Sequence, residues 1–362
     1  MRIGVDARPF EARPTGVGRY LEGLLGAWLA AFPGDTFVLL SPRPVSIPEA
    51  LSGRVEAVTV GAGMPGTAWL QTHASRAAVT HRAEAFWGPL GILPVRGRLP
   101  GVATVHDLTP LLHPEWHDLR NRLGFAPFIG PTVRRASQIA AISEATRRDL
   151  VARFPEAAVK CTVVPNGVAP FPPPSDAPAP NDGRPYVLYL GTLEPRKNVP
   201  RLVEALESVW DRRPDFPDLV LAGGAGWGLP GFLSRLERSR HATRIRHAGY
   251  VTREASAHLL RHARLLAYPS LYEGFGLPPL EAMALGTVVV GSSSSSLPEV
   301  IGDAGLLPDP LSVSEIARAV QRANDDETWR VAAARRGLER AARFTWDRAA
   351  RSMRTLFERA IG

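Results

Sequence analysis

Short aliphatic runs alternate with longer amphipathic stretches along most of this chain, and this alternation restricts the possible folds more than any other feature of the sequence. The runs have the length and the β-branched composition of buried parallel strands, and the stretches between them are long enough to form covering helices. We therefore expect an α/β fold with parallel sheets. In the first half of the chain the expected strands are 2–6, 37–40, 55–60, 85–87, 102–106 and 138–143.

A proline-rich segment divides this pattern into two halves. Residues 165–185 read PNGVAPFPPPSDAPAPNDGRP, a composition typical of a linker. The alternation resumes after this segment, and a chain of 362 residues has the length of two domains of similar size. We expect two Rossmann-like, doubly wound domains, 1–168 and 185–345, connected by a linker at 169–184. The strands expected in the second domain are 186–191, 219–222, 245–250, 265–268, 288–291 and 305–307.

Sequence signals also mark the ends of several helices. One helix is expected from residue 17 to about residue 32, with an apolar stripe on one side. Another begins at Ser143, a residue type that favours the N-cap position. Ser312 and Glu315 form a capping-box pattern, and a last helix follows Thr345. Because ligands bind at the carboxyl ends of parallel strands, a ligand can be held between the two domains.

The charge balance of the chain is basic. Lysine and arginine together number 43 against 35 aspartates and glutamates, which gives a formal net charge of +8. Such a surplus attracts anions, and these include nucleic acid, an anionic membrane face and phosphorylated substrates. The sequence has no basic run with interleaved aromatic residues, no zinc-finger spacing and no helix-turn-helix pattern. We therefore expect no nucleic-acid partner.

The expected compartment is the cytoplasm. No window of the sequence has the apolar length of a transmembrane helix, and the start, MRIGVDARPF, has the pattern of a strand rather than of a signal peptide. The single cysteine, Cys161, has no partner for an intrachain disulfide, which fits a reducing compartment. The basic charge is also compatible with peripheral contact to the anionic inner face of a membrane.

The segment YVLYLGTLEPRKN, residues 186–198, carries the most informative chemical signal. A buried strand ends at Gly191, and Arg196 and Lys197 precede a helix that starts near Asn198. Backbone N–H groups at a helix start, together with two fixed cations, form a pocket for a diphosphate. The cations would offset the negative charge that builds on a departing β-phosphate. The alternative is a solvent-exposed pair in a surface turn.

A second informative segment, YPSLYEGFGLPPLEAMALG, spans residues 268–286. We expect Glu273 at the mouth of a strand, where its carboxylate can accept hydrogen bonds from sugar hydroxyls. Glu281 is expected in the next helix, where it can hold a ribose diol. Gly274 and Gly276 allow the backbone to approach a ligand closely. The competing interpretation makes both glutamates solvent-facing residues of a turn and a helix, and it does not account for the two glycines.

A glycine loop, RPTGVGRY, lies at residues 13–20. It is not the dinucleotide-binding pattern, because Leu21 stands at the third glycine position after Gly16 and Gly18. A Walker A pattern is also absent from the sequence, since Arg196 stands where its second glycine is required. The missing dinucleotide pattern counts against a nicotinamide-dependent dehydrogenase. The loop can still cradle a phosphate or admit an acceptor.

The segment VHDLTPLLHPEW places His106 and Asp107 at the carboxyl end of an apolar strand. His106 can donate a hydrogen bond to a sugar hydroxyl or orient the acceptor, and Asp107 can fix the tautomer of His106 or act nearby. His113 and His117 lie close in sequence, but no H-E-x-x-H pattern or cysteine pairing supports a zinc site. We therefore expect no metal ion.

Two further segments have ordinary structural explanations. Residues 116–135 mix aromatic and arginine side chains as a membrane-surface helix does, but Pro127 and Pro131 interrupt the pattern and favour a covering helix. The serine run at 292–296 is expected to form a flexible loop at the end of a strand.

Together these motifs resemble the retaining GT-B glycosyltransferases of family 4, especially the bacterial mannosyltransferase-like members. The resemblance covers nearly the whole chain. It rests, in chain order, on GVGRY, VHDLTPLLHPEW, PNGV, GTLEPRKN, two glutamates separated by seven residues, SLPEV and FTWDRAA. It implies two Rossmann-like domains facing a central cleft, with an acceptor domain at 1–168 and a nucleotide-sugar donor domain at 185–345. A C-terminal helix, 346–362, would pack back on the first domain.

The resemblance also assigns roles to single residues. Arg196 and Lys197 resemble the diphosphate-binding pair of the family, and Glu273 resembles the carboxylate that reads the donor sugar hydroxyls. Glu281 resembles the residue that holds the nucleotide ribose, and His106 the histidine near the donor sugar. The expected catalytic residues are His106, Asp107, Glu273, Arg196 and Lys197. The expected donor-binding residues are Gly16, Gly18, Gly191, Arg196, Lys197, Tyr250, Gly274, Phe275, Gly276, Leu277 and Glu281.

The activity implied by the resemblance is a metal-independent hexosyl transfer with retention, in which the donor's own phosphate oxygen helps to deprotonate the acceptor. No cofactor is expected. The choice of GDP-mannose as donor rests on the resemblance alone, and the expected acceptor is a glycan or a lipid-linked sugar. The alternatives are a nucleotide-sugar epimerase or phosphorylase of the same fold, and a nucleotide-sugar binding protein without turnover.

Overall fold

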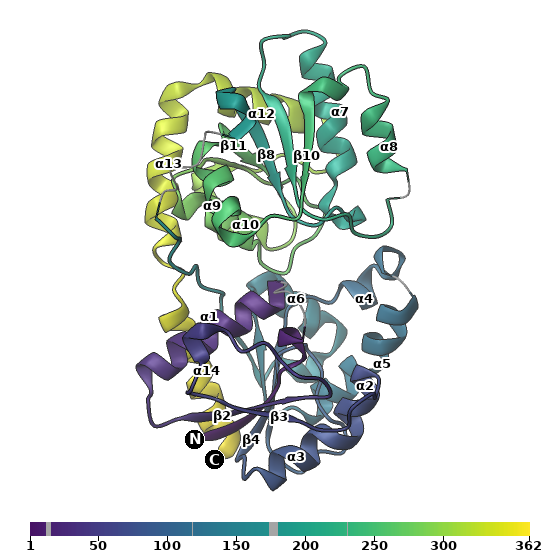
Figure 1. The fold of residues 1–362 in the computed structure, drawn as a ribbon, viewed down its shortest axis with the longest axis vertical. Helices are drawn as coiled ribbons and strands as arrows, with labels where there is room; N and C mark the ends of the chain where they lie inside the picture. The colour runs from purple at the N-terminus through teal and green to yellow at the C-terminus, as the bar shows by residue number, and fades with distance from the viewer. Residues whose placement is uncertain (12–15, 118, 174–179, 230) are drawn as a thin grey trace. The chain divides into compact units, whose positions relative to one another are not determined.

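The computed structural model describes residues 1–11, 16–117, 119–173, 180–229 and 231–362 (Figure 1). The chain divides into two compact units. Unit 1 comprises Met1–Ala169 together with Phe344–Gly362, and unit 2 comprises Pro170–Arg343. The chain therefore returns to unit 1 at its C-terminal end. Each unit is built on its own parallel sheet, as the alternation of strands and helices predicts.

The described part of unit 1 contains a seven-stranded parallel sheet in the order β3-β2-β1-β4-β5-β6-β7. The predicted strands of the first half are all present, with ends that differ by a few residues at most. One strand, β7, was missed because its three residues are only half-buried at the sheet edge and form no aliphatic run. The strands are β1 Arg2–Asp6, β2 Thr36–Ser41, β3 Glu56–Thr59, β4 Ala85–Gly88, β5 Gly101–Val105, β6 Gln138–Ala141 and β7 Cys161–Val163.

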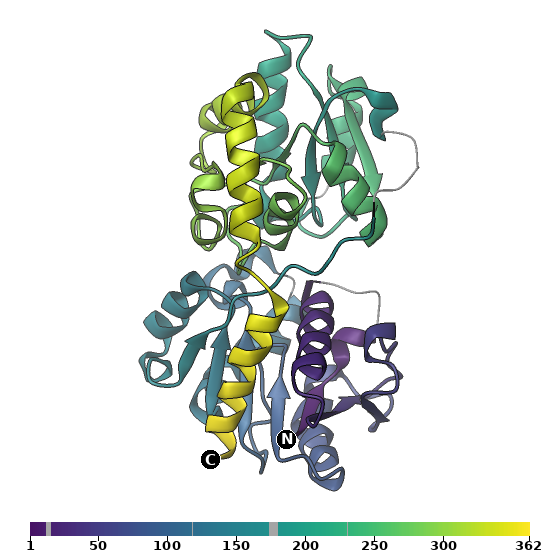
Figure 2. The ribbon, with the colours of Figure 1, turned by 90° about the vertical axis from the view of Figure 1, so that its left-hand side faces the viewer.

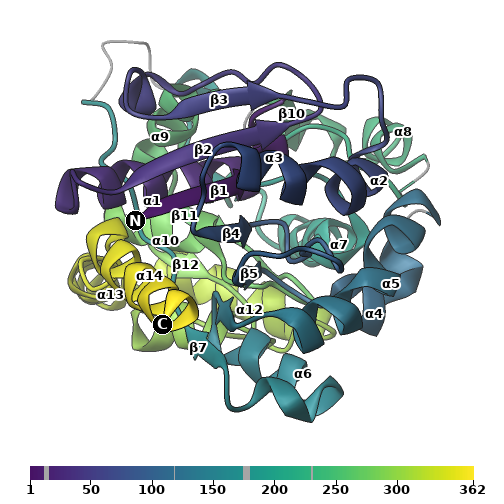
Figure 3. The same ribbon diagram turned by 90° about the horizontal axis from the view of Figure 1, so that it is seen from below.

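Helices cover both faces of this sheet (Figure 3). On one face α1 packs against the last helix, α14. On the other face the apolar residues of α3 and α5 pack over β2, β4, β5 and β6. The helices of unit 1 are α1 Gly16–Ala31, α2 Gly66–Trp69, α3 Ser75–Thr80, α4 Thr109–Leu112, α5 Leu119–Arg135, α6 Glu144–Arg153 and α14 Trp346–Ile361.

Helix α5 is a covering helix, as its sequence favours. It continues through Pro127 and Pro131, and its side chains Ile129 and Val133 are buried against the sheet. Within the described ranges, no helix combines the length and the apolar character that a membrane span requires.

Helix α14 lies beside α1 in unit 1 (Figure 2), and aromatic side chains pack between α14 and its surroundings. The Phe357 ring lies 5.6 Å from that of Trp28 and 6.1 Å from that of Trp87, and the Trp346 ring lies 5.9 Å from that of Tyr20. Edge-to-face pairs at these distances add to the stabilisation from burial.

A buried carboxylate adds an ionic link between α14 and the residues around β2. Asp35 is only 4% exposed. It accepts hydrogen bonds from the amino group of Met1 at 2.7 Å, from Trp28 Nε1 at 2.9 Å and from Arg354 Nε at 2.9 Å. These donors lower the pKa of Asp35 although its burial acts in the opposite direction.

The described part of unit 2 contains a six-stranded parallel sheet in the order β10-β9-β8-β11-β12-β13. Its strands confirm those predicted from the second half of the sequence. They are β8 Tyr186–Leu190, β9 Asp218–Ala222, β10 Ile245–Gly249, β11 Leu265–Ala267, β12 Val289–Val290 and β13 Gly305–Leu306. The helices are α7 Val199–Trp210, α8 Phe232–Glu237, α9 Arg253–His262, α10 Leu277–Ala284, α11 Leu297–Ile301, α12 Val313–Asp325 and α13 Glu327–Ala341.

The predicted helix starts at Ser143, Ser312 and Thr345 are confirmed. The Ser143 hydroxyl accepts a hydrogen bond from the backbone of α6, and the Thr345 hydroxyl does so for α14. Ser312 caps α12 by accepting from Glu315 N at 3.2 Å. The reciprocal half of the capping box differs from the prediction, because the Glu315 carboxylate accepts from Asp309 N instead.

Candidate functional site

The expected diphosphate-binding residues follow β8 in unit 2. All five residues of β8 are buried, and the chain leaves the strand at Gly191. A short 3₁₀ turn over Pro195–Lys197 then carries Arg196 and Lys197. Helix α7 begins directly after Asn198, near the predicted position. The two cations therefore lie at the carboxyl end of a central strand.

Backbone conformation explains the glycine at the end of β8, because Gly191 has a φ of +150°, which residues with a side chain rarely adopt. A Cβ atom at Gly223 would lie 1.9 Å from the carbonyl oxygen of Gly191, so the two chain segments cross with no room for a side chain. The two glycines therefore have backbone roles that are independent of any ligand: Gly191 for its φ, and Gly223 for this close approach.

Four charged side chains form one buried cluster at the carboxyl ends of the strands. We call it the ion cluster. Its members are Glu194, Arg196, Lys197 and Glu273. Lys197 Nζ lies 2.6 Å from Glu273 Oε1, and Arg196 Nη1 lies 3.0 Å from Glu273 Oε2. Arg196 Nη2 lies 2.8 Å from Glu194 Oε1. The structure thus brings the predicted cations and the predicted carboxylate into direct contact.

The ion cluster is balanced in charge among its described contacts. Its two cations are matched by two carboxylates, and Lys197, Glu194 and Glu273 are all nearly buried. The Arg196 side chain is the most exposed member, at 20%. Arg196 is therefore the member of the cluster that is most accessible from solvent. Lys197 Nζ also donates to the hydroxyl of Tyr268 at 2.7 Å, which holds it in place.

Electrostatics keep the Glu273 carboxyl ionised. Burial alone would raise its pKa, but the charges of Lys197 and Arg196 outweigh burial and lower the pKa to about 2. An ionised carboxylate is an acceptor only, which suits the recognition of hydroxyl groups. Burial raises the pKa of Tyr268 far above its ordinary range, so its hydroxyl stays protonated beside the cluster.

The serine run after β12 holds the Glu273 segment in position. Ser295 Oγ accepts a hydrogen bond from Glu273 N at 2.8 Å. Ser296 Oγ lies 2.9 Å from the carbonyl oxygen of Glu273 and 2.8 Å from that of Phe275, and Ser292 Oγ donates to Ser270 O at 2.7 Å. The sequence correctly predicted that the serine run follows a strand, but it did not predict these contacts. Small hydroxyl residues at the ends of neighbouring strands are the signal that would have indicated them.

Gly276 ends this segment and begins α10. Its φ of +107° is strained for any residue with a side chain, and an added Cβ would lie 2.7 Å from Leu297 Cδ2. Leu277 is the first residue of α10, and Glu281 lies further along the same helix. The structure therefore explains Gly276 by its backbone conformation and its packing against Leu297, and the close approach to a ligand stays a prediction.

The remaining expected residues of unit 2 have different surroundings. Phe275 is buried and Gly274 precedes it in the Glu273 segment. Tyr250 is 53% exposed and follows β10, the edge strand of the sheet, so two strand positions separate it from β8. No contact described in the structure places Tyr250 in the ion cluster.

His106 and Asp107 follow β5 in unit 1, as predicted. His106 Nε2 lies 2.8 Å from the carbonyl oxygen of Pro89, and since a carbonyl can only accept, this nitrogen carries the proton. Burial lowers the pKa of His106 and favours the neutral ring. Nδ1 of the neutral ring is then an acceptor, so His106 is arranged to accept a hydrogen bond rather than to donate one.

Asp107 has a local partner in the structure. Its Oδ1 accepts from Thr109 N at 2.9 Å and from Thr109 Oγ1 at 2.6 Å, which stabilises the turn before α4. The His106 tautomer is set by Pro89 in the described contacts, whereas the expectation assigned that task to Asp107. The His106 ring also packs edge-on against Tyr20 with centroids 4.9 Å apart.

The other predicted features of unit 1 were also located. Gly16 and Gly18 lie within the first turn of α1, while residues 13–15 of the glycine loop fall outside the described residues. His117 Nε2 contacts Thr109 Oγ1 at 2.9 Å, and His113 stacks on Trp116. Across the described residues, no group of three or more potential metal ligands is found.

Comparison with known families and proteins gives consistent matches. Residues 16–171 match the family described as Glycosyltransferase Family 4, and residues 175–343 match Glycosyl transferases group 1. O-antigen chain mannosyltransferase B of Escherichia coli is 31% identical to this chain over 370 residues. That alignment covers 96% of this chain and 97% of the relative.

Solved structures match over almost the whole length as well. A sucrose-phosphate synthase from Thermosynechococcus elongatus has a TM-score of 0.78 at 21% identity, covering 99% of this chain and 98% of that chain. Anabaena HepE in complex with UDP-glucose has a TM-score of 0.73 at 19% identity, covering 99% of both chains. These likenesses confirm the predicted fold class.

Proposed function

We infer the reaction of this chain from the premise that it belongs to the family 4 glycosyltransferases of GT-B fold. The chain is thus a glycosyltransferase. We propose that it transfers a hexosyl group, specifically mannosyl, from a nucleoside diphosphate sugar to a hydroxyl of a glycan or lipid-linked acceptor. The mannosyl assignment is supported by the name of the Escherichia coli relative, and GDP-mannose is the donor that we propose for it.

The ion cluster is the observation that carries this proposal. Arg196 and Lys197 would bind the donor diphosphate, and Glu273 would accept hydrogen bonds from the sugar hydroxyls. Direct contacts of 3.0 Å and 2.6 Å between these cations and Glu273 support a site in which sugar and diphosphate are read side by side. Glu281 on α10 is proposed to hold the nucleotide ribose.

The proposed chemistry needs cations where negative charge develops. As the bond between the anomeric carbon and the phosphate oxygen breaks, charge accumulates on the departing β-phosphate. Arg196 and Lys197 are held in place before the reaction by Glu194, Glu273 and Tyr268, so little reorganisation is required during bond cleavage.

We propose that transfer proceeds with retention of the anomeric configuration. The acceptor oxygen forms a bond to the anomeric carbon on the face from which the phosphate leaves, and the acceptor proton moves to a phosphate oxygen of the leaving group. This route uses no enzyme nucleophile. His106, with Nδ1 as an acceptor, is proposed to hold a hydroxyl of the donor sugar.

A donor panel with product analysis tests the proposal. Thermal unfolding of the full chain is followed with GDP-mannose, UDP-glucose and other nucleotide sugars in the presence of EDTA. We expect GDP-mannose to raise the melting temperature and Arg196→Ala to remove most of that shift. Arg212→Ala, a change at an exposed arginine after α7, is the matched control and should retain it.

Product analysis then separates transfer from the other reactions. With a mannose-terminated oligosaccharide as acceptor, we expect an α-linked extended product and free GDP. An epimerised nucleotide sugar formed without acceptor, or donor binding with no turnover on any acceptor of the panel, would contradict the proposal. A product of inverted configuration would overturn the retaining mechanism alone.

A further inference from the structure

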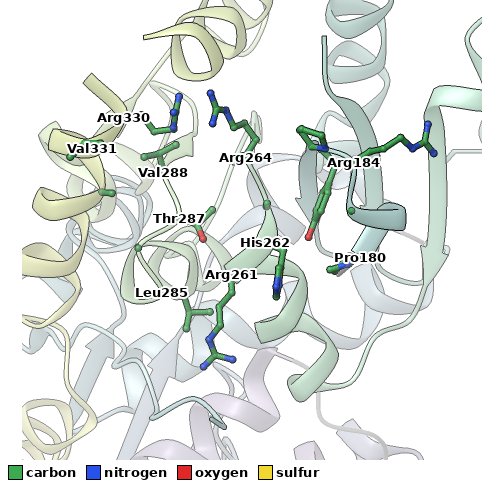
Figure 4. Close-up of a pocket in the computed structure, with 16 residues that line it drawn as sticks. Pro180, Arg184, Arg261, His262, Arg264, Leu285, Thr287, Val288, Arg330 and Val331 are labelled. Atoms are coloured by element: carbon green, nitrogen blue, oxygen red, sulfur yellow. The ribbon is translucent and has the colours of Figure 1, made fainter. Parts of the chain in front are cut away.

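Unit 2 contains a cavity of about 450 Å³ at the amino ends of its strands (Figure 4). The ion cluster lies at the opposite, carboxyl ends. Its lining includes Tyr186, the first residue of β8, and Arg264, which directly precedes β11. The ion cluster lies beyond the other ends of these strands. A five-residue strand spans roughly 16 Å, so the cavity and the ion cluster are separate places on the same sheet.

The lining of this cavity is strongly basic. Arg184, Arg261, Arg264, Arg330 and His262 contribute to it, and no aspartate or glutamate is found among the described lining residues. The carboxylates that contact these arginines lie outside the lining, so the described lining itself presents cations to the cavity, whereas charged groups are normally paired when they leave water.

Arg184 and Arg261 have partners that hold their side chains at the margin of the cavity. Arg184 Nη1 lies 3.1 Å from Asp218 Oδ2, and Arg261 Nη2 donates to the carbonyl oxygen of Pro172 at 2.6 Å. Both side chains extend from the margin of the cavity, whereas Arg264 and Arg330 lie together on one side of it (Figure 4).

Arg264 and Arg330 converge on the C-terminal end of α12. Arg264 Nη2 donates to the carbonyl oxygen of Asn324 at 2.9 Å, and Arg330 Nη1 donates to the same oxygen at 2.8 Å. Capping of α12 therefore explains why both arginines are present. A carbonyl does not cancel their charge, however, and each guanidinium has five N–H donors, more than these bonds use.

Only one described carboxylate contacts this arginine pair. Glu327 lies against Arg330 and 3.8 Å from Arg264, but its side chain is 69% exposed and its charge is well screened by water. Burial lowers the pKa of Arg330 and the neighbouring charge of Arg264 acts in the same direction, whereas the charge of Asp326 acts to raise it. The pair thus places guanidinium N–H donors, beyond those used in these contacts, beside an open volume.

We propose that this cavity is a second anion site and binds small phosphate monoesters. Guanidinium groups recognise phosphate oxygens through paired hydrogen bonds, and Arg264 and Arg330 supply two such groups on one wall. Leu285, Val288 and Val331 supply apolar surface for the group that carries the phosphate. The volume lies within the range of small-molecule sites.

The test measures binding of inorganic phosphate to the full chain by ³¹P line broadening. We expect Arg264→Gln to weaken binding roughly tenfold, the loss of about one charge-assisted contact. Since Arg264→Gln also removes a cap of α12, a second variant leaves every arginine in place. Val331→Asp adds a carboxylate at an exposed lining position and should weaken binding as well.

Two controls locate the binding. Arg335→Ala changes an 80% exposed arginine on the same helix as Arg330 and should leave phosphate binding unchanged. Arg196→Ala, in the ion cluster, should retain the binding that depends on Arg264. Phosphate affinity that is unchanged in both Arg264→Gln and Val331→Asp, or that is lost in Arg196→Ala, would overturn the proposal.

The phosphate monoester can be carried by a soluble metabolite or by a lipid headgroup. Vesicles of phosphatidylcholine with and without phosphatidic acid form the second arm of the experiment. Arg264-dependent binding of inorganic phosphate supports the soluble source, and Arg264-dependent binding to phosphatidic acid vesicles alone supports the headgroup. Absence of Arg264-dependent binding in both arms contradicts the site. This inference does not depend on the proposed reaction, since neither readout uses turnover.

Discussion

Lys197 Nζ lies 2.6 Å from Glu273 Oε1, although 76 residues separate the two side chains along the chain. Lys197 follows β8 and Glu273 follows β11, and these strands are direct neighbours in the sheet of unit 2. Because both strands are parallel, their carboxyl ends meet at one edge. The contact is therefore a product of the strand order, and it places a buried carboxylate against the two cations expected to bind a diphosphate.

Removal of Glu194 should strengthen diphosphate binding. Glu194 contacts Arg196 at 2.8 Å, so Glu194→Gln leaves the ion cluster with one more positive charge than negative charge. We expect the nucleoside diphosphate of the donor to bind roughly three- to tenfold more tightly. Isothermal titration calorimetry measures this change, and Glu204→Gln on α7 serves as control. Weaker binding would show instead that Glu194 is needed to orient Arg196.

The Glu273 carboxylate should make stability depend on pH in the acid range. Its pKa is lowered to about 2 from an ordinary value near 4.5, so its contribution is fully present above about pH 5 and is lost as the pH falls toward 2. The shift corresponds to roughly 3 kcal/mol at neutral pH. Thermal unfolding of wild type and Glu273→Gln should therefore converge as the pH falls. A constant difference between pH 7 and pH 3 would contradict this.

All strands except β7 were predictable from the sequence, because most buried parallel strands are continuous apolar runs and such runs are local features. Arg196 and Lys197 could be placed at a strand end for the same reason. The contacts of these cations with Glu273 could not be predicted, since they require β8 and β11 to be neighbours and nothing local specifies strand order.

Other parts of the candidate site depend on contacts between distant residues. Ser296 is one of five similar serines in a row, and only its position opposite the carbonyl groups of Glu273 and Phe275 distinguishes it. The His106 tautomer depends on Pro89, a neighbour in space that no spacing rule indicates. Strand β7 contains no continuous apolar run and gave no periodic signal.

Asp35→Asn should destabilise unit 1 by loosening its C-terminal helix. Asp35 accepts charged hydrogen bonds from Arg354 and from the amino group of Met1, and a neutral amide accepts both less strongly. We expect a loss of about 1–3 kcal/mol, seen as a lower melting temperature. Asp347→Asn breaks an exposed pair with Arg351 on the same helix and should change stability by less than about 1 kcal/mol. Equal effects of the two variants would contradict this explanation.

His106→Gln should separate the structural from the catalytic contribution of the ring. The glutamine amide can still donate to Pro89 but lacks the Nδ1 acceptor, so we expect kcat to fall by roughly 10- to 100-fold with little change in melting temperature.

The same variant should also change the pH dependence of stability. The folded pKa of His106 is lowered, so the unfolded chain takes up a proton first and wild-type stability declines below about pH 6.5. His106→Gln should lack that part of the decline. Identical pH profiles would show that another group is responsible.

Ser296→Ala tests whether the serine run positions Glu273 for turnover. Ser296 Oγ lies within hydrogen-bonding distance of two carbonyl oxygens of the Glu273 segment, and its loss leaves these buried groups without that partner, at a cost of about 1–3 kcal/mol. We expect a lower melting temperature and, at 25 °C where the protein is still folded, a reduced kcat, because Glu273 is no longer held against Lys197 and Arg196. Ser293→Ala, at an exposed position of the same run, should affect neither quantity. A destabilised Ser296→Ala with wild-type kcat at 25 °C would mean that the serine supports the fold without positioning the carboxylate.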